Sequence, residues 1–284
     1  MSGAASPAPD ARPPGKIAET ASAKGARKAA LEWPVLSVLA VLAGAYIGFG
    51  GLFFLLAQAG AEAMPYGAAQ VLGGVVFSLG LILVLVGGAE LFTGNTLLVV
   101  AWAEGRAGFA PVLWALGLAW VMNFLGAVAL AALAFVADVH MLGDGALGAA
   151  ALRVAERKSE LGFATALASG VAANILVCLA VWLAFGARSA ADKVLVIVPP
   201  IAAFVALGLE HSVANMSLIP FGWMVRDGAG AGFWVQTGLD PAAHAAIGLG
   251  GLFGNLLPVT IGNVIGGFLV GGAYWLAYLR PKGD

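Results

Sequence analysis

Five long stretches of the 284-residue chain contain no aspartate, glutamate, lysine or arginine. These stretches are residues 33–61, 63–89, 107–137, 161–187 and 241–279. A helix needs about 20 consecutive apolar residues to cross the hydrocarbon core of a bilayer, and each stretch exceeds that length. A sixth stretch, residues 194–225, is interrupted only by Glu210 and His211. The sequence therefore predicts an all-α integral membrane protein with six transmembrane helices.

The composition argues against several other classes of protein. The chain is 61% hydrophobic and 10% charged, its net charge is -1, and it has no basic array suited to nucleic acid. The single cysteine, Cys178, excludes an intrachain disulfide. With three histidines and one cysteine, none at ligand spacing, we expect no metal site and no cofactor.

Two similar motifs place a carboxylate inside the apolar sequence. Glu90-Leu-Phe-Thr-Gly-Asn95 and Glu210-His-Ser-Val-Ala-Asn215 each have an asparagine five positions after the glutamate. A charge within a membrane span is costly unless it is partnered, and broken helices are typical of transport sites. We therefore predict that helices 2 and 5 break at these motifs around one permeation path. Helix 2 is expected to resume over residues 96–103, and helix 5 to break over residues 208–212.

The basic residues indicate the orientation, because lysine and arginine are retained on the cytoplasmic side. With the N-terminus inside, ten basic residues lie on that side and four lie outside. Both termini of this multi-pass protein are therefore expected in the cytoplasm, inside the inner (cytoplasmic) membrane. Residues 1–33 are interpreted as an unstructured tail over residues 1–15 followed by a surface helix, and residues 34–280 as the six-span domain. The charged stretch 138–160 is expected to be an outer loop.

The two halves of the chain share further positions. Asn123-Phe-Leu-Gly126 in the third span matches Asn263-Val-Ile-Gly266 in the sixth. Because three is odd, the second set of three spans enters the membrane from the opposite side. The pattern is that of a 3+3 inverted repeat, which places both breaks near the membrane midplane.

Four motifs in this order closely resemble the formate/nitrite transporter family, over residues 30–280. They are Glu90-Leu-Phe-Thr-Gly-Asn95, Asn174-Ile-Leu-Val-Cys-Leu-Ala-Val-Trp182, Glu210-His-Ser-Val-Ala-Asn-Met216 and Pro258-Val-Thr-Ile-Gly-Asn263. The resemblance implies an aquaporin-like helical fold assembled as a homopentamer with one pore per protomer. It also implies that Thr93, in the broken helix 2, approaches a pore histidine, His211.

The same resemblance assigns roles to further residues of the pore. Leu91 and Phe92 resemble a cytoplasmic constriction, and Phe77, Leu81 and Phe204 an outer one. Lys158 resembles a vestibule lysine whose field attracts anions. Asn174 and Asn263 resemble polar residues of the chamber between the constrictions. Glu210 is expected to brace the break by accepting backbone N–H bonds.

Physical chemistry explains why such a pore needs a histidine. Moving a bare carboxylate through an apolar constriction has an idealised cost of tens of kcal/mol. Protonating an acid with a pKa near 4 at pH 7 costs only about 4 kcal/mol. An imidazole can lend that proton, or hold the anion by donating a hydrogen bond. We therefore expect selectivity for small weak-acid anions.

Simpler interpretations remain for the same residues. His211 could be a core histidine bonded to backbone carbonyls, Lys158 a solvated charge, and the aromatic positions ordinary packing. Glu210-His211-Ser212 has the residue types of a hydrolytic triad, but adjacent positions point in different directions and no Gly-x-Ser-x-Gly motif is present. An enzyme is therefore not expected. A channel for water or glycerol would instead give swelling that does not depend on pH.

The substrate is less constrained than the family. Gly94-Asn95 favours nitrite or hydrosulfide transport, whereas Gly186-Ala-Arg-Ser189, Asp192-Lys193 and Ile219-Pro-Phe-Gly222 favour formate. The longer match makes formate the first expectation, with nitrite or hydrosulfide as the alternative. Sequence alone does not decide between channel-like and proton-coupled flux.

Overall fold

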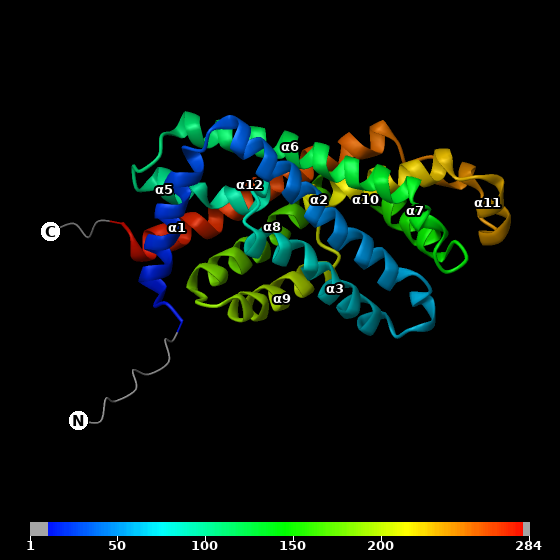
Figure 1. Ribbon diagram of the computed structural model, residues 1–284, viewed down its shortest axis with the longest axis horizontal. Helices are drawn as coiled ribbons and strands as arrows, with labels where there is room; N and C mark the ends of the chain where they lie inside the picture. Colours follow the sequence, from blue (N-terminus) through cyan, green and yellow to red (C-terminus); the bar gives the residue numbers. More distant parts are fainter. Residues whose placement is uncertain (1–10, 281–284) are drawn as a thin grey trace, which may run out of the picture.

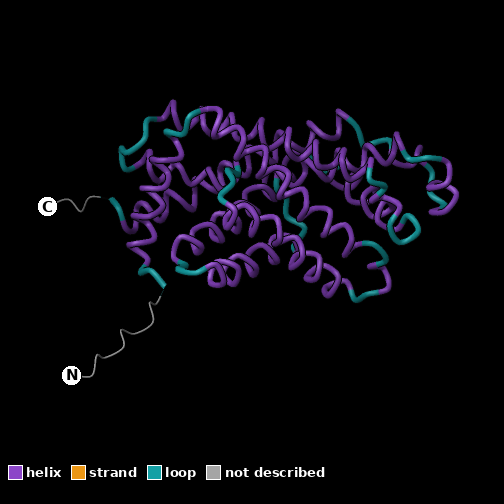
Figure 2. Tube along the Cα trace, viewed as in Figure 1, coloured by secondary structure: helices purple, strands orange, loops and turns teal. Residues whose placement is uncertain are grey.

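The computed structural model describes residues 11–280, and every regular element in that range is a helix (Figures 1 and 2). Residues 1–10 and 281–284 lie outside the described residues, so most of the predicted tail over residues 1–15 lies outside them too. Within the described range, the predicted all-α fold class is confirmed.

Five helices are long and apolar enough to cross a membrane, by length and composition. They are α2 (Trp33–Gln58), α3 (Tyr66–Gly87), α6 (Phe109–Val136), α8 (Phe163–Gly186) and α12 (Leu249–Tyr278). Their bounds follow the uncharged stretches, because the charged residues mark the positions where each apolar run ends. The exception is α12, which begins at Leu249 although its uncharged stretch begins at residue 241, since the short 3-10 helix η4 (Pro241–His244) precedes it.

Two helices are broken at the glutamate motifs. After α3 the chain resumes as α4 (Phe92–Asn95), η2 (Thr96–Leu98) and α5 (Val99–Ala103), four residues earlier than the predicted start at residue 96. The second break separates α9 (Ala190–Ala206) from α10 (Ser212–Gly228). Gly88 and Gly208 have φ values of 83° and 66°, a left-handed backbone that glycine adopts without the usual Cβ penalty. Both helices therefore break where glycine allows the chain to turn.

The long helices pack in pairs through very close backbone contacts. α2 lies along α6, α8 lies along α12, and α3 packs against α9. A Cβ on Gly44 of α2 would overlap the carbonyl oxygen of Asn123, and one on Gly126 of α6 would overlap that of Val41. A Cβ on Gly266 of α12 would likewise overlap the carbonyl oxygen of Val171 on α8. Glycine thus lets the helices approach closely enough to gain dispersion contacts that side chains would prevent.

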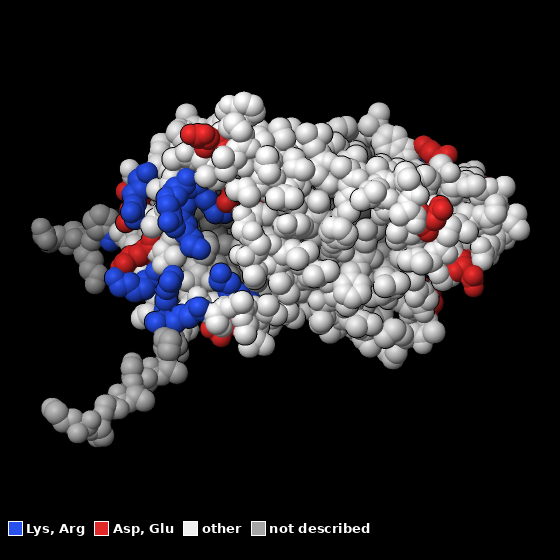
Figure 3. Space-filling model, viewed as in Figure 1, with Lys and Arg blue, Asp and Glu red and all other residues white. Residues whose placement is uncertain are grey.

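The charges are confined to the two ends of the molecule on the face shown in Figure 3. Lysine and arginine gather at the end that carries α1, together with several aspartates and glutamates, whereas the other end of this face shows only aspartate and glutamate, and the middle is uncharged. Large apolar side chains are exposed along the long helices, including Leu133 of α6 (64%) and Leu257 of α12 (62%). An exposed apolar band of this kind indicates contact with lipid or with neighbouring subunits.

The basic end is covered by α1 (Pro14–Ala29), which packs against α5 and α8. It buries Ile17, Ala18 and Ala21 on one face. The helix predicted after residue 15 is therefore present, and it contacts the helical core rather than standing apart from it.

The acidic end is covered by α7 (Ala146–Ser159), α11 (Ala231–Thr237) and the short 3-10 helices η1 (Ala61–Ala63) and η3 (Val139–Met141). The expectation of a charged loop over residues 138–160 is wrong, because most of that stretch is α7. Leu147 and Leu152 are fully buried, and α7 packs closely on α10. The helix is amphipathic, with charged residues on one face and buried apolar residues on the other, so the density of charges in the sequence did not indicate a packed helix.

His140 lies buried between aromatic rings at this end. Its ring stacks on Phe135 at a centroid distance of 4.8 Å and lies 5.8 Å from Phe233 of α11. Burial lowers the pKa of His140 below its ordinary value, although the nearby carboxylate of Asp138 opposes the shift. The folded state therefore disfavours the imidazolium form of this side chain.

We expect the stability of the protein to fall as the pH drops through the ordinary histidine pKa of about 6.5. Below that pH the unfolded chain binds a proton at His140 more readily than the folded chain does, which favours unfolding. Thermal unfolding midpoints in detergent, measured from pH 7.5 to 5, should decline less steeply in His140→Phe than in wild type. Equal slopes in the two proteins would show that His140 does not contribute to the pH dependence.

Candidate functional site

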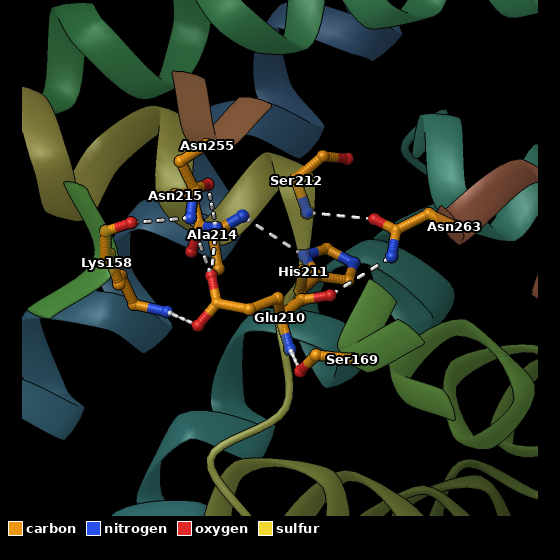
Figure 4. Close-up of polar contacts among 9 residues, drawn as sticks. All are labelled: Lys158, Ser169, Glu210, His211, Ser212, Ala214, Asn215, Asn255 and Asn263. Carbon is orange, nitrogen blue, oxygen red and sulfur yellow. Dashed lines mark hydrogen bonds and ion pairs between the residues drawn. The ribbon is translucent and has the colours of Figure 1, made fainter. Parts of the chain in front are cut away.

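The break between α9 and α10 is held by the side chain of Asn263 on α12 (Figure 4). Its Oδ1 accepts the N–H of Ser212 at 2.9 Å, and its Nδ2 donates to the carbonyl oxygens of Gly170 at 2.8 Å and Glu210 at 3.1 Å. The N–H of Glu210 donates to the Ser169 hydroxyl at 3.0 Å. Backbone groups left without a helical partner are costly in an apolar environment, and these side chains satisfy them.

Asn123 on α6 does the same for the break after α3. Its Oδ1 accepts the N–H of Phe92 at 2.8 Å, and its Nδ2 donates to the carbonyl oxygens of Ala40 at 2.7 Å and Glu90 at 3.0 Å. Asn123 and Asn263 are the two positions matched between the halves of the sequence, and their hydrogen bonds match as well.

The two motif glutamates also have equivalent partners. The carboxylate of Glu210 lies 2.8 Å from the ammonium of Lys158 and accepts hydrogen bonds from Asn215 at 2.6 Å and Asn255 at 3.1 Å (Figure 4). The expectation that Glu210 accepts backbone N–H bonds is wrong, because these are all side-chain donors. The backbone donors of this break face Asn263 and Ser169 instead.

Glu90 repeats this arrangement at the other break. Its carboxylate lies 2.8 Å from the ammonium of Lys28 on α1 and accepts a hydrogen bond from Asn95 at 2.9 Å. Lys28 also donates to the amide oxygen of Asn95 at 2.9 Å. Each buried carboxylate therefore has a lysine and the asparagine five positions after it as partners.

His211 and Thr93 bring the two breaks together. The Nε2 atom of His211 lies 2.8 Å from the hydroxyl of Thr93, and the two residues are 2% and 0% exposed. Nδ1 of His211 accepts the N–H of Ala214 at 3.1 Å and so caps the N-terminus of α10. Because Nδ1 is an acceptor, the proton of a neutral ring lies on Nε2, which then donates to Thr93.

Asn174 extends this polar centre along α8. Its Nδ2 lies within donating distance of the Thr93 carbonyl, the Thr96 hydroxyl and the Asn263 carbonyl, at 3.3, 3.1 and 2.5 Å. Its Oδ1 is buried and accepts no hydrogen bond. The Oδ1 atom of Asn174 thus remains available as an acceptor at this polar centre, whereas both atoms of the Asn263 amide already hydrogen-bond backbone groups at or beside the break.

A cavity adjoins this centre on the α7 side, and its lining includes Phe77, Phe204, Lys158 and His211. The rings of Phe77 and Phe204 meet edge to face at a centroid distance of 5.6 Å, and Phe204 lies 5.8 Å from the His211 ring. The structure therefore places both phenylalanines together next to the histidine.

A second cavity lies on the α1 side and is lined by Leu81, Leu91, Lys24 and Lys28 among others. The sequence analysis grouped Leu81 with Phe77, but one helical turn along α3 places it in this cavity with Leu91. Phe92 is buried and is not among the lining residues described for it. Burial, together with nearby lysines and arginines, lowers the pKa of Lys24 on α1.

Sequence reasoning did not assign several residues that complete the site. Lys28 was counted only as a basic residue, and Asn255 was not considered. Asn255 donates to both Glu210 and the carbonyl oxygen of Lys158, so it links α12 to α7. The signal in the sequence that could have identified Asn255 is an asparagine within an uncharged span. No group of three or more metal-ligating side chains occurs among residues 11–280.

The sequence profile of the formate/nitrite transporter family matches residues 15–276. The chain belongs to this family. This confirms the resemblance carried by the four motifs. The formate channel FocA of Escherichia coli K12 is 40% identical over 272 residues, covering 95% of each chain. A probable formate transporter of Methanothermobacter thermautotrophicus is 38% identical and covers 86% of this chain and 88% of its own.

Solved structures of the family have the same fold. A pentameric formate channel with formate bound superposes with a TM-score of 0.83 at 39% identity, covering 87% of this chain and 98% of the other. A family ion channel superposes with a TM-score of 0.78 at 30% identity, covering 92% and 98%. The chain is therefore a membrane protein with the fold of these channels.

We expect Lys158→Met to destabilise the protein by about 3–5 kcal/mol, because it leaves the buried carboxylate of Glu210 without its counterion. The double variant Lys158→Met with Glu210→Gln should recover much of this loss, since no unpaired charge remains. Thermal unfolding in detergent, monitored by tryptophan fluorescence, measures the stability of the single and the double variant. Equal destabilisation in the single and double variants would mean that the ion pair is not the cause.

Proposed function

We propose that this chain forms a pore for small monovalent weak-acid anions in the cytoplasmic membrane, with formate as the preferred substrate. Nitrite or hydrosulfide is the alternative within the same family. The observation that carries the proposal is the buried contact between His211, which lines the cavity on the α7 side, and Thr93, whose neighbour Gly94 lines the cavity on the α1 side. The named relatives that are formate channels support formate as the first choice.

The two cavities suit a pathway for anions. The cavity on the α1 side is lined by Lys24 and Lys28 and that on the α7 side by Arg157 and Lys158, and both are also lined by apolar side chains. Leu81 and Leu91 form the apolar constriction on the α1 side, and Phe77 with Phe204 forms that on the α7 side. An anion that passes these side chains loses most of its water, so the hydrogen-bonding groups between them decide which solute crosses.

The ring of His211 can act on the anion in two ways. Its Nε2–H can turn from the Thr93 hydroxyl to the anion and replace one lost hydrogen bond. Alternatively, the ring can take up a proton from solution on Nδ1, which breaks its bond to the Ala214 N–H, and pass the Nε2 proton to the anion, which leaves the Nδ1–H tautomer. The ring is then neutral again, and the solute is an uncharged acid. Only the anion of a weak acid accepts a proton by this second route.

The same contacts argue against hydrolysis at Glu210-His211-Ser212. The Glu210 carboxylate faces Lys158, and both ring nitrogens of His211 face Thr93 and Ala214. None of these bonds links the three side chains to one another, as a nucleophile, base and orienting carboxylate require. We therefore assign no catalytic role to this chain.

For the assembly we propose six spans in a 3+3 inverted repeat, with α3–α5 and α9–α10 as the broken helices. The equivalent hydrogen bonds of Asn123 and Asn263 support the repeat. We further propose a homopentamer with one pore per protomer and both termini in the cytoplasm. The pentameric formate channel of similar fold supports the homopentamer, and the basic end around α1 supports the cytoplasmic position of the termini.

Uptake into proteoliposomes tests the substrate class. We expect formate to enter faster than nitrite and hydrosulfide, and entry of each to rise as the external pH falls, because the protonated fraction of a weak acid increases. Chloride should enter at least tenfold more slowly. Osmotic swelling with glycerol that does not change with pH, and no uptake of the three weak-acid anions, would indicate a neutral-solute channel instead.

Substitution of His211 tests the mechanism. His211→Phe should abolish formate uptake while native mass spectrometry still detects the pentamer, because a ring of similar size preserves packing. His211→Asn retains hydrogen-bonding capacity but does not titrate near neutral pH. It should flatten the pH dependence of uptake and admit anions of strong acids. Formate uptake with the wild-type rate and pH profile in His211→Asn would assign the imidazole a structural role only.

A further inference from the structure

A third and larger cavity lies at the α7 end, next to the smaller cavity that holds the phenylalanine pair. Its volume is ≈ 370 Å³, and its lining includes Glu62, Gln70, Arg153 and Arg157. Gln70 and Arg157 also line the smaller cavity that reaches His211, so the two spaces adjoin. We call the larger one the α7 vestibule. A solute that moves from the α7 end toward His211 passes the side chain of Arg157.

Two of the three basic side chains that line the α7 vestibule or the adjoining smaller cavity are paired with a carboxylate. Arg153 lies 2.7 Å from the carboxylate of Glu62, and Lys158 lies 2.8 Å from that of Glu210. Lys158 is also only 8% exposed, so a solute meets its charge together with that of its counterion. The electrostatic attraction expected of Lys158 is therefore reduced by the carboxylate beside it.

Arg157 is the exception. It is exposed, and no carboxylate among residues 11–280 forms an ion pair with it. On α7 it follows Arg153 by four positions and shares its face, whereas the next residue, Lys158, points inward to Glu210. The guanidinium therefore presents an unpaired positive charge to an anion in the α7 vestibule.

The surroundings give this charge further importance. Exposed carboxylates at the α7 end include those of Asp138, Asp144, Glu160 and Asp240, and Figure 3 shows acidic residues at that end. The neighbouring Arg226 is paired with Asp227 at 2.6 Å. Arg157 is therefore an unpaired positive charge at an end of the molecule that carries several exposed carboxylates.

We propose that Arg157 captures substrate anions in the α7 vestibule and raises their local concentration before the Phe77–Phe204 constriction. Lys158 then acts mainly as the counterion that holds Glu210 at the break. The inference rests on the proposed function, since it names the residue that recruits the anion to that pore. Arg157 acts when the anion enters the α7 vestibule, and the polar centre at His211 acts when the anion crosses the pore.

Uptake kinetics at low ionic strength test the recruitment. Arg157→Gln should raise the formate concentration for half-maximal uptake by about two- to fivefold and leave the maximal rate unchanged, because one charge near the path changes local concentration. Arg157→Lys should retain the wild-type value. The difference should disappear near 1 M salt, where the screening length is about 3 Å.

The ion pair of the same vestibule supplies the matched control. The double variant Glu62→Gln with Arg153→Gln removes two charges of opposite sign and leaves the net charge of the α7 vestibule unchanged. It should shift half-maximal uptake by less than about twofold. A shift in this control as large as that in Arg157→Gln, or no shift in Arg157→Gln, would overturn the proposal.

A measurement independent of transport separates this inference from the proposed function. Gln70→Cys places a thiol in the α7 vestibule, and the native thiol of Cys178 is buried and unreactive by comparison. Negatively and positively charged methanethiosulfonate reagents then report the local potential. Adding Arg157→Gln should lower the ratio of anionic to cationic modification rates by about tenfold at low salt.

The two experiments together give distinct outcomes. A lower rate ratio with unchanged half-maximal uptake means that the charge is present but does not recruit formate, which overturns the proposal. An unchanged rate ratio also overturns it, whatever the transport result. If wild-type vesicles carry no weak-acid anion, the proposed function fails, and the rate ratio still decides whether Arg157 sets the anion potential of the α7 vestibule.

Discussion

The fold depends on satisfying backbone groups where two helices stop in the middle of an apolar layer. No water is available there, so each interrupted helix needs donors and acceptors from neighbouring side chains. One asparagine on a continuous neighbouring helix supplies them at each break: its oxygen accepts an N–H of the break, and its nitrogen donates to one carbonyl of the break and to one carbonyl of α2 or α8. The irregular segments that carry Thr93 and His211 are held in place by these six hydrogen bonds, and the pore geometry follows from them.

The carboxylates of Glu90 and Glu210 fit the same logic. A buried carboxylate is stable only when it is paired and hydrogen-bonded, and each has a lysine and an asparagine as partners. The side-chain partners of both carboxylates are lysines and asparagines rather than His211 or Thr93, so these charges stabilise the breaks. In the proposed pore, an anion would meet the apolar side chains, the imidazole and the exposed guanidinium of Arg157.

Much of the fold and of the candidate site could be predicted from the sequence, because hydropathy and charge patterns depend only on the order of residues along the chain. The lengths of the apolar helices, the two breaks and the meeting of Thr93 with His211 all follow from local patterns or family motifs. The hydrogen bonds of Asn123 and Asn263 could not be predicted, since they depend on which helix faces which. Helix α7 was missed because its buried face is composed largely of alanine and leucine between charges. Leu81 was misplaced because a family motif does not record how far one helical turn moves a side chain along a pore.

The order of the ion-pair partners along the chain has a consequence for biosynthesis. Lys28 precedes Glu90, and Lys158 precedes Glu210, so each lysine leaves the ribosome before the glutamate that it neutralises. Chains emerge from the N-terminus at about 5–20 residues per second, which puts each counterion several seconds ahead of its carboxylate. A glutamate that enters the bilayer can then pair at once, and neither half of the protein has to wait for the other to be translated.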